Sequence, residues 1–281
     1  MTRNKSFNNG PLLYLVATPI GNLKEISRRA LEVFEDADII AAEDTRNTYS
    51  LLANYSIKKE LFSLREHNEI EASNHLIKLM KDGKKIVYVS DAGYPGISDP
   101  GYLLVKAAIK EGINVSTVSG SSAFINGLVA SGLPTEHFYF YGFLSKKGNE
   151  AKEALNQLVK REETLIFYES PHHIKKTLEI MLEVFGNRDA VIARELTKIN
   201  EEYIRGSLEE LVNINEETLK GEMVILIKGR EASNEEVSNE DIKDKLQYYL
   251  DYKVDKKTAI ELVKNDLKVE KKRVYKIATE L

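Results

Sequence analysis

Short strand-like runs alternate with segments of helical periodicity through the first half of the chain. The strand candidates are LLYLVA (12–17), ADIIAA (37–42), IVYVS (86–90) and NVSTVS (114–119). Between the first two, apolar residues recur at helical spacing at Ile26, Ala30, Leu31 and Phe34. The charged segments before the third and fourth end in Gly83 and Gly112, where a helix-terminating glycine belongs. Apolar strands that alternate with helices predict a mainly parallel sheet covered on both faces.

The pattern changes after SGLPTEHF, where Gly132 and Pro134 end the helix candidate SSAFINGLVA. Five further strand candidates follow: FYFYGF (138–143), TLIFYES (164–170), DAVIARE (189–195), EEYIRGS (201–207) and GEMVILIKG (221–229). Only three helical segments fall among them. This shortage of helices predicts a mixed sheet with direct connections between some strands. We place a domain boundary near residues 133–137.

The last segment follows REASNEEVSNE (230–240), which has the composition of a linker. Beyond it, three short helices fit the pattern, and in the last one Val274, Ile277, Ala278 and Leu281 fall on one face. Residues 241–281 hold 11 Lys/Arg and 8 Asp/Glu, a net charge of +3. The segment fits either a helix-turn-helix-like nucleic-acid reader or a solvated helical appendage.

The expected fold is therefore α/β, with an N-terminal α/β domain over 11–133 and a mixed α/β domain over 134–229. A small helical domain over 241–281 completes it. The chain has no cysteine, which excludes disulfides and thiol chemistry and suits a cytoplasmic protein. No His-x-x-x-His pair exists among the five histidines, so we expect no metal site. No apolar run approaches membrane-spanning length, and the start MTRNKSFNNG lacks the apolar stretch of a secretory signal.

A stiff loop, VSDAGYPGISDPG (89–101), separates a strand candidate from a helix candidate. Its glycines do not match Gly-x-Gly-x-x-Gly, and no Gly-Lys-Ser/Thr sequence exists in the chain. Carboxylates beside bare backbone suit a ligand with amine, sulfonium or ribose hydroxyl groups. The loops 18–22 and 120–123 also follow strands, so all three are expected at one crevice. Ordinary turn chemistry is the better explanation of each loop taken alone, whereas the three loops together favour a binding site.

Six motifs in order resemble the bacterial small-subunit ribosomal RNA 2′-O-methyltransferases of the tetrapyrrole methylase superfamily (class III S-adenosylmethionine enzymes). They are ATPIGNL, AAEDTR, VSDAGYPGISDPG, VSGSSA, FYESPHHI and ARELTKINEEYIRG. The resemblance runs from about residue 11 to residue 229. It implies two α/β domains that enclose S-adenosylmethionine, a homodimer, and methylation of the ribose of a decoding-centre cytidine in 16S rRNA of the small ribosomal subunit.

The resemblance also implies a set of cofactor-binding residues. In the first domain these are Pro19, Gly21, Ser90, Asp91, Ala92, Gly93, Ile97, Ser98, Asp99, Ser121, Ser122 and Ala123. In the second domain they are Phe167, Tyr168, Ala193, Arg194, Met223 and Val224, which would hold the adenine and ribose.

Four charged residues are candidates for catalysis, since a sugar hydroxyl is a poor nucleophile at neutral pH. In AAEDTR, Asp44 would act as base or ribose acceptor and Arg46 as a phosphate clamp. A helix N-cap at Asp44 or Thr45 explains the same residues, and both can hold. In FYESPHH, Ser170 and Pro171 fit a helix start, which leaves Glu169 and His172 unexplained.

Lys198 could lower the pKa of the hydroxyl or bind phosphate, or belong to a surface salt-bridge ladder. His67 and Asn68 rank lowest, because a lone loop histidine is usually capping or solvated. Paired basic residues such as Lys146–Lys147 and Lys175–Lys176 predict RNA binding that weakens as salt rises, despite the net charge of −4. The alternatives are a methylase of a tetrapyrrole-like small molecule on the same fold, and a non-enzymatic ligand-sensing regulator.

Overall fold

The computed structural model describes residues 10, 12–231, 238–267 and 269–281. Its chain forms two compact units, Met1–Arg230 and Glu231–Leu281. Most of the predicted linker 230–240 and all but the last residue of the start MTRNKSFNNG lie outside the described residues, as does residue 11.

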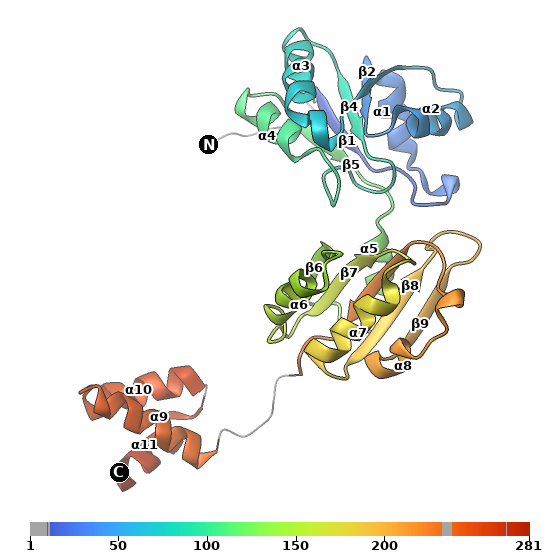
Figure 1. Cartoon of the computed structure of the whole chain (residues 1–281). Coiled ribbons are helices and arrows are strands. Elements are labelled where there is room, and N and C mark those ends of the chain that lie inside the picture. The colour runs from blue at the N-terminus through green and yellow to red at the C-terminus, as the bar shows by residue number, and fades with distance from the viewer. Residues whose placement is uncertain (1–9, 11, 232–237, 268) are drawn as a thin grey trace. The chain divides into compact units, whose positions relative to one another are not determined.

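A five-stranded parallel sheet forms the first half of the larger unit, in the order β3-β2-β4-β1-β5. Its strands are β1 (Leu13–Val16), β2 (Ile39–Ala42), β3 (Glu60–Ser63), β4 (Ile86–Val89) and β5 (Val115–Val118). The helices around it are α1 (Arg28–Asp36), α2 (Thr45–Asn54), α3 (Glu69–Lys81) and α4 (Tyr102–Lys110), with 3₁₀ turns at Leu23–Glu25 and Glu66–Asn68. Figure 1 shows α3 and α4 on one face of this sheet and α1 and α2 on the other.

The apolar alternation of the strands explains these two layers. In β2, Ile39 and Ala41 join the core under α3 and α4, whereas Ile40 and Ala42 join the core under α1 and α2. The predicted parallel sheet is confirmed, and all four of its predicted strands are present. The edge strand β3, with the sequence ELFS, was not predicted. Its glutamate is exposed and its other residues are half-buried, so it lacks the apolar run of a central strand.

The second sheet has the order β6-β7-β10-β8-β9. Its strands are β6 (Phe138–Phe143), β7 (Thr164–Glu169), β8 (Asp189–Arg194), β9 (Glu202–Ser207) and β10 (Met223–Ile227). β6 and β7 are parallel, and the other three pairings are antiparallel, so the predicted mixed sheet is confirmed. β8 joins β9 with no helix between them, as the shortage of helices predicted.

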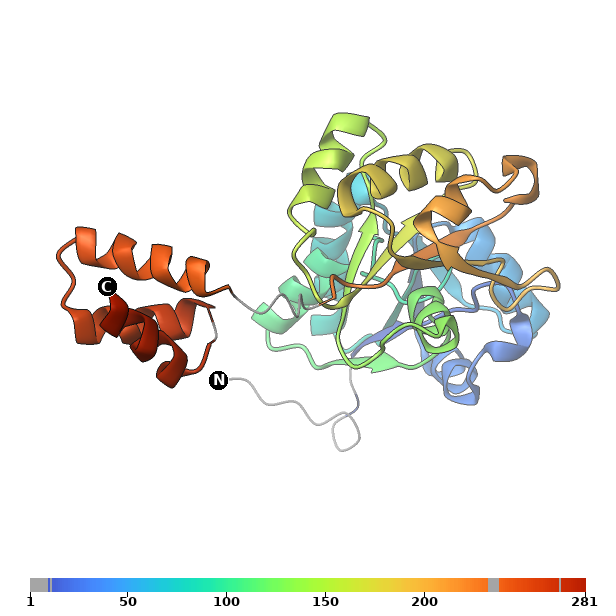
Figure 2. The same ribbon diagram turned by 90° about the horizontal axis from the view of Figure 1, so that it is seen from below.

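Helices cover both faces of the second sheet. α6 (Gly148–Asn156), α7 (Ile174–Phe185) and α8 (Leu208–Val212) cover one face, and a 3₁₀ turn lies at Glu216–Thr218. α5 (Ala123–Ser131) packs on the opposite face, which Figure 2 shows from below. α5 follows β5 in sequence, yet its Leu128 packs among residues of β7, β8 and β10. The division into domains at 133/134 stays a prediction, and both sheets belong to one compact unit.

The smaller unit contains α9 (Asn239–Asp251), α10 (Lys256–Leu267) and α11 (Lys271–Glu280). The three helices share a core that includes Ile242, Leu246, Val263 and Val274. The predicted apolar face of the last helix is confirmed at Val274, Ile277 and Ala278, which are buried. It is wrong at Leu281, which lies beyond the helix end and is 42% exposed.

Candidate active site

Hydrogen bonds join the three loops that follow β1, β4 and β5. Thr18 and Gly93 exchange two backbone bonds of 2.9 and 3.0 Å. The Gly120 amide donates to the Tyr94 hydroxyl at 3.2 Å, and the Thr18 hydroxyl donates to the Ser90 carbonyl at 3.3 Å. These strands are parallel neighbours, so their carboxyl ends meet at the same edge. The expected convergence of the three loops is therefore confirmed.

The loop over residues 90–101, here called the β4 loop, is held by close packing at its end. Gly101 has φ +130°, and a Cβ there would lie 2.6 Å from the ring of the fully buried Tyr88. The Tyr88 hydroxyl donates to the Pro100 carbonyl at 2.9 Å. Glu69 of α3 accepts hydrogen bonds from the amides of Gly101 and Leu103 at 2.8 and 2.9 Å. It therefore caps the N-terminus of α4, although it is far from α4 in the sequence. Ser98 has φ +62°, which costs backbone strain in a residue other than glycine.

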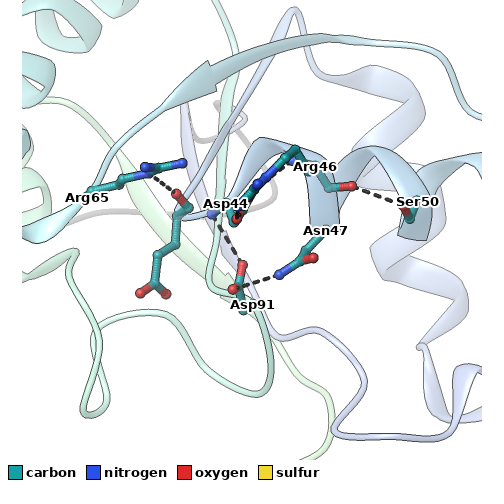
Figure 3. A network of polar contacts seen from close by, with 7 residues as sticks. Asp44, Arg46, Asn47, Ser50, Arg65 and Asp91 are labelled. Carbon is teal, nitrogen blue, oxygen red and sulfur yellow. Dashed lines mark hydrogen bonds and ion pairs between the residues drawn. The ribbon is translucent and has the colours of Figure 1, made fainter.

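Asp91 connects the β4 loop to the start of α2, as Figure 3 shows. Its carboxylate accepts from the Asp44 amide at 3.2 Å and from the Asn47 side-chain amide at 2.9 Å. Arg65 donates from Nε to the Glu43 carbonyl at 3.0 Å on the other side of the same junction. The predicted cofactor residue Asp91 therefore also fixes the position of the AAEDTR motif.

Carboxylates crowd this edge of the sheet. Burial, the nearby Glu43 carboxylate and Asp91 raise the pKa of Asp99 to about 6, although a hydrogen bond from Ser90 opposes the rise. Burial and the Asp91 charge likewise raise the pKa of Glu43. Raised carboxyl pKa values show that the folded protein keeps negative charge where it is disfavoured. We call Glu43, Asp91 and Asp99 the acidic edge.

Asp44 caps α2, as the alternative interpretation predicted. Its side chain accepts from the Arg46 amide at 2.9 Å and forms an ion pair with the Arg46 guanidinium. The hydrogen bonds from Arg46 lower the pKa of Asp44 well below its usual range, which makes its carboxylate a weak base. The Arg46 side chain is 83% exposed, so its outer nitrogen atoms can reach a ligand. The cap is confirmed, and the catalytic roles of both residues stay predictions.

A cavity of about 260 Å³ lies between the first loop and α2. It includes four residues that the sequence predicted for the cofactor: Pro19, Gly21, Ser90 and Asp91. The wall that α2 contributes, which includes Asn47, Ser50 and Asn54, was not predicted. Their spacing of three and four residues on one helix face was the available signal. The remaining wall residues are Thr18, Leu23, Thr48 and Leu51.

The ARELTK loop of the second sheet packs onto the loop after β1. Gly21 has φ +143°, and a Cβ there would lie 2.5 Å from Cγ of Lys198, so only glycine leaves room for the lysine chain. The Lys198 ammonium pairs with Glu195 at 2.9 Å and with Glu222 at 3.0 Å. Burial acts to lower the pKa of Lys198, but the two carboxylates outweigh it and raise the pKa. The predicted alternative of ion pairing is present, and Lys198 stays charged.

Five of the six predicted adenine and ribose residues lie in two adjacent rows across the second sheet, and Phe167 lies in the next row, paired with Ile225. Met223 pairs with Arg194 and with Glu169, and Val224 pairs with Ala193 and Tyr168. Tyr168, Ala193 and Val224 belong to the apolar cluster on the α5 face, together with Ile20 of the first loop. The buried side chains of Phe167 and Met223 belong to the core on the opposite, α7 face. Those two can therefore meet a ligand on the α5 face only through their backbone.

The guanidinium of Arg194 is engaged within the second sheet. It donates to the Glu202 carboxylate at 2.6 Å and to the Lys220 carbonyl at 3.0 Å. These bonds tie the ends of β8 and β9 to the segment before β10. The charge of Arg194 is thus largely satisfied by the protein itself.

The structure assigns Glu169 to the turn between β7 and α7. Its carboxylate accepts from the Ser170 amide at 2.7 Å and from the Thr177 hydroxyl at 2.5 Å. The predicted helix start at Ser170 and Pro171 is wrong, because α7 begins at Ile174 after a turn, with His173 at its N-cap. Glu169 lines a second cavity and is not among the residues that line the cavity beside Asp91. His172 is exposed.

The remaining candidates lie around the same loops. The Ser121 hydroxyl donates to Glu25 at 2.6 Å, Ser122 is the N-cap of α5, and Ala123 is its first residue. Ile97 is 44% exposed, and Ala92 is exposed beside it in the β4 loop. The Asn68 side chain accepts a hydrogen bond from the Arg65 amide at 2.7 Å. This structural role agrees with the placing of His67 and Asn68 as the weakest functional candidates.

The described residues contain no cluster of three or more His, Asp or Glu that could hold a metal ion. No helix among them has the length and apolar character needed to cross a bilayer.

Comparison with known proteins gives a consistent result. The family model of the Tetrapyrrole (Corrin/Porphyrin) Methylases matches residues 12–212. The ribosomal RNA small subunit methyltransferase I of Halalkalibacterium halodurans is 46% identical, over 94% of this chain and 93% of its own length. The protein of the same name from Bacillus subtilis is 41% identical, over 98% of this chain and 97% of its own length. The solved uroporphyrin-III-C-methyltransferase of Thermus thermophilus superimposes with a TM-score of 0.56 at 20% identity, over 77% of this chain and 93% of that one.

Proposed function

Since this chain belongs to the tetrapyrrole methylase family and is a methyltransferase, we propose that it methylates the ribose 2′-oxygen of a cytidine in 16S ribosomal RNA, with S-adenosylmethionine as donor. The observation that carries the proposal is the identity of 41–46% to two ribosomal RNA small subunit methyltransferases over nearly their whole length. The solved uroporphyrin-III-C-methyltransferase supports only the fold, because it is 20% identical to this chain.

The residues at the acidic edge fit the donor's chemistry. S-adenosylmethionine, when bound, supplies a methyl group on a positively charged sulfur atom. Asp91 lines the cavity together with Pro19 and Gly21, and the carboxylates of Glu43 and Asp99 are close enough to Asp91 to interact with its charge. Charge interactions are strong at such a partly buried edge. Burial makes the charged forms of Glu43 and Asp99 unfavourable, and a bound cation would offset that cost.

The same pKa values rank the groups that could take the proton of the ribose hydroxyl. Asp44 is a weak base because Arg46 lowers its pKa. Lys198 holds its proton because its two ion pairs raise its pKa. Glu43 and Asp99, whose pKa values burial raises, are the better proton acceptors at neutral pH. Arg46 remains suited to contact a phosphate of the substrate, since its guanidinium is exposed and its Nη1 is not used in the pair with Asp44.

The test uses purified small ribosomal subunits that lack the modification and S-adenosylmethionine labelled with tritium in its methyl group. After digestion of the RNA to nucleosides, we expect the label in 2′-O-methylcytidine. Label in a base-methylated nucleoside would contradict the reaction. A parallel incubation with a reduced tetrapyrrole tests the alternative that the enzyme methylates a tetrapyrrole-like small molecule. Efficient labelling of the tetrapyrrole, with no label in RNA, would favour that alternative over our proposal.

We also propose that the enzyme acts as a cytoplasmic homodimer, as the resemblance implies. Light scattering on the purified protein gives the mass directly and is expected to return twice the 31.8 kDa of one chain. A monomer that retains full activity would contradict the dimer and leave the assigned reaction intact.

A further inference from the structure

The second cavity lies at the carboxyl ends of the parallel strands β6 and β7. It has a volume of about 290 Å³ and is enclosed by the turns that lead into α6 and α7. The residues that line it are Phe143, Leu144, Ser145, Lys146, Gly148, Ala151, Glu169, Ser170, His173, Lys176, Thr177 and Ile180. It is distinct from the cavity beside Asp91, since the two share no lining residue.

Two lysines give this cavity positive charge. Lys146 and Lys176 are both exposed, and within the described part of the chain neither ammonium forms an ion pair or a hydrogen bond. Their sequence neighbours are engaged: Lys147 pairs with Glu150, and Lys175 donates to the Val212 carbonyl. The Lys176 ammonium lies 3.7 Å from the position that a Cβ of Gly148 would occupy, so it sits at the first residue of α6.

The acid that lines the cavity is already satisfied. Both carboxylate oxygens of Glu169 accept hydrogen bonds, one from the Ser170 amide in the turn and one from the Thr177 hydroxyl in the first turn of α7. The N-cap of α7, His173, makes no side-chain capping bond, and it also lines the cavity. Lys146 and Lys176 outnumber Glu169, so the cavity favours an anion, and two ammonium groups at a helix start suit a phosphate.

An exposed aromatic ring stands at the same cavity. Phe143 is 59% exposed, and its ring centroid lies 5.4 Å from that of Tyr168. The residue before it, Gly142, contacts the β4 loop: a Cβ there would lie 3.2 Å from Oγ of Ser98. Gly142 therefore lies against the β4 loop, which carries Asp99, and the next residue, Phe143, lines the cavity. A cationic pocket beside an exposed ring matches the needs of a single-stranded nucleotide, which offers a phosphate and a stacking base.

We propose that this cavity binds a backbone phosphate of the RNA substrate, with Lys146 and Lys176 as its ligands and Phe143 stacking on an adjacent base. The inference rests on the proposed function and deepens it, because it names where the strand beside the target nucleotide is held. Glu169 is a positioning residue in this arrangement, since its bonds to Ser170 and Thr177 fix the start of α7, where His173 is the N-cap and Lys176 lies in the first turn.

The test compares the double variant Lys146→Ala/Lys176→Ala with Lys160→Ala, a matched loss of an exposed lysine beyond the other end of α6 that does not line the cavity. Binding is measured on a single-stranded RNA fragment that spans the methylated site, across a salt series. We expect the double variant to bind at least tenfold more weakly. The slope of log K against log salt should shrink by about 0.7 for one lost phosphate contact on a single strand. Lys160→Ala should change affinity less than twofold.

Kinetics on small subunits give the second readout. The double variant should raise KM for subunits about tenfold and leave KM for S-adenosylmethionine within twofold. Equal losses in both variants, an unchanged salt slope, or weaker binding to subunits with unchanged binding to RNA would each overturn the phosphate site. The RNA-binding measurement needs no turnover, so it tests the phosphate site independently of the reaction. If the wild-type enzyme methylated another substrate, that result would contradict only the proposed function.

Discussion

The two cavities occupy corresponding places in the two sheets, at the carboxyl ends of parallel strands, yet they carry opposite charge. Asp91 lines the first and interacts electrostatically with Glu43 and Asp99, whereas Lys146 and Lys176 line the second. The net charge of −4 does not reveal this separation. The charge at the strand ends of each sheet is therefore a better guide to ligands than the net charge: it favours a cationic ligand at the first sheet and an anionic ligand at the second.

The two edges also differ in how their charges are supported. At the first, Asp91 bonds to the start of α2, and burial raises the pKa values of Glu43 and Asp99. At the second, both lysines are exposed and make no ion pair within the described residues. The first edge is thus built into the fold at a cost in stability, whereas the second is a solvated surface feature. Substitutions at the first should change stability and binding together, and those at the second binding alone.

The largest effect is expected for Gly101→Ala at the first edge. The new Cβ would meet the buried ring of Tyr88 at 2.6 Å, in a backbone conformation with φ +130°. We expect a loss of about 3 kcal/mol in the free energy of unfolding, which is the range of a strained and overpacked core site. Urea unfolding measures it. Gly112→Ala is the control, because it has φ +73° but no atom within 4 Å, and should cost about 1 kcal/mol. Equal losses would show that Tyr88 does not hold the β4 loop.

The next effect is on donor affinity in Asp91→Ala. Removal of this carboxylate deletes a charge of the acidic edge and two hydrogen bonds, to Asp44 and Asn47. We expect the Kd for S-adenosylmethionine, measured by calorimetry, to rise at least tenfold, or about 1.4 kcal/mol. Asn47→Ala removes one of the bonds and keeps the charge, so it should raise Kd no more than about threefold. Similar losses in the two variants would show that Asp91 acts only as an anchor for α2.

A smaller effect, on stability, is expected for Asp99→Asn. The pKa of Asp99 is raised to about 6 by burial and by Glu43, so the folded state binds its proton more tightly than the unfolded chain does. The charged form therefore destabilises the fold, increasingly as pH rises from about 4 to about 6 and fully above that. The neutral amide should stabilise the protein by about 1 kcal/mol at pH 8, a figure kept low because the carboxylate is partly exposed.

Thermal unfolding of the Asp99→Asn variant between pH 4 and pH 8 checks this. The gain should shrink steadily as the pH falls from 8 toward 4, where the wild-type carboxyl is protonated in the folded state and only partly ionised in the unfolded chain. A difference that does not vary with pH would contradict the assignment of burial and Glu43 as its cause. Weaker binding of S-adenosylmethionine by the stabilised variant would show that the acidic edge trades stability for function.

The smallest effect is expected from removal of the helical unit after Arg230. Its core consists of residues of α9, α10, α11 and the turns between them, and neither sheet contributes to that core. We expect the truncated chain to keep its affinity for S-adenosylmethionine within twofold in calorimetry. A large loss of affinity would show that the helical unit takes part in the donor site, which would contradict a donor site built from the first sheet edge.

Periodicity predicted most of the fold, because buried strands and amphipathic helices leave a direct record in apolar spacing. Nine of the ten strands found in the described residues follow from it, and β3 does not, because three of its four residues are only partly covered and pack at a sheet edge. The late start of α7 was also missed. Ser170 and Pro171 favour a helix start locally, but Glu169 holds Ser170 in a preceding turn.

The candidate site was predictable to a similar degree. Glycine, proline and aspartate in the loops after β1, β4 and β5 indicated a shared edge, and hydrogen bonds between Thr18, Gly93 and Tyr94 realise it. Contacts between distant segments were not predictable, since neither the Lys198 chain across Gly21 nor the separation of Glu169 from Asp91 has a local signal. Such pairings depend on the tertiary arrangement of the two sheets.

The most direct test of the central claim is a crystal structure of the protein with S-adenosylmethionine. The account predicts that the donor contacts Pro19, Gly21 and the β4 loop, with its positively charged groups facing the carboxylates of Asp91 and Asp99. Density for the donor in the cavity between Phe143 and Lys176, or anywhere away from the acidic edge, would contradict it.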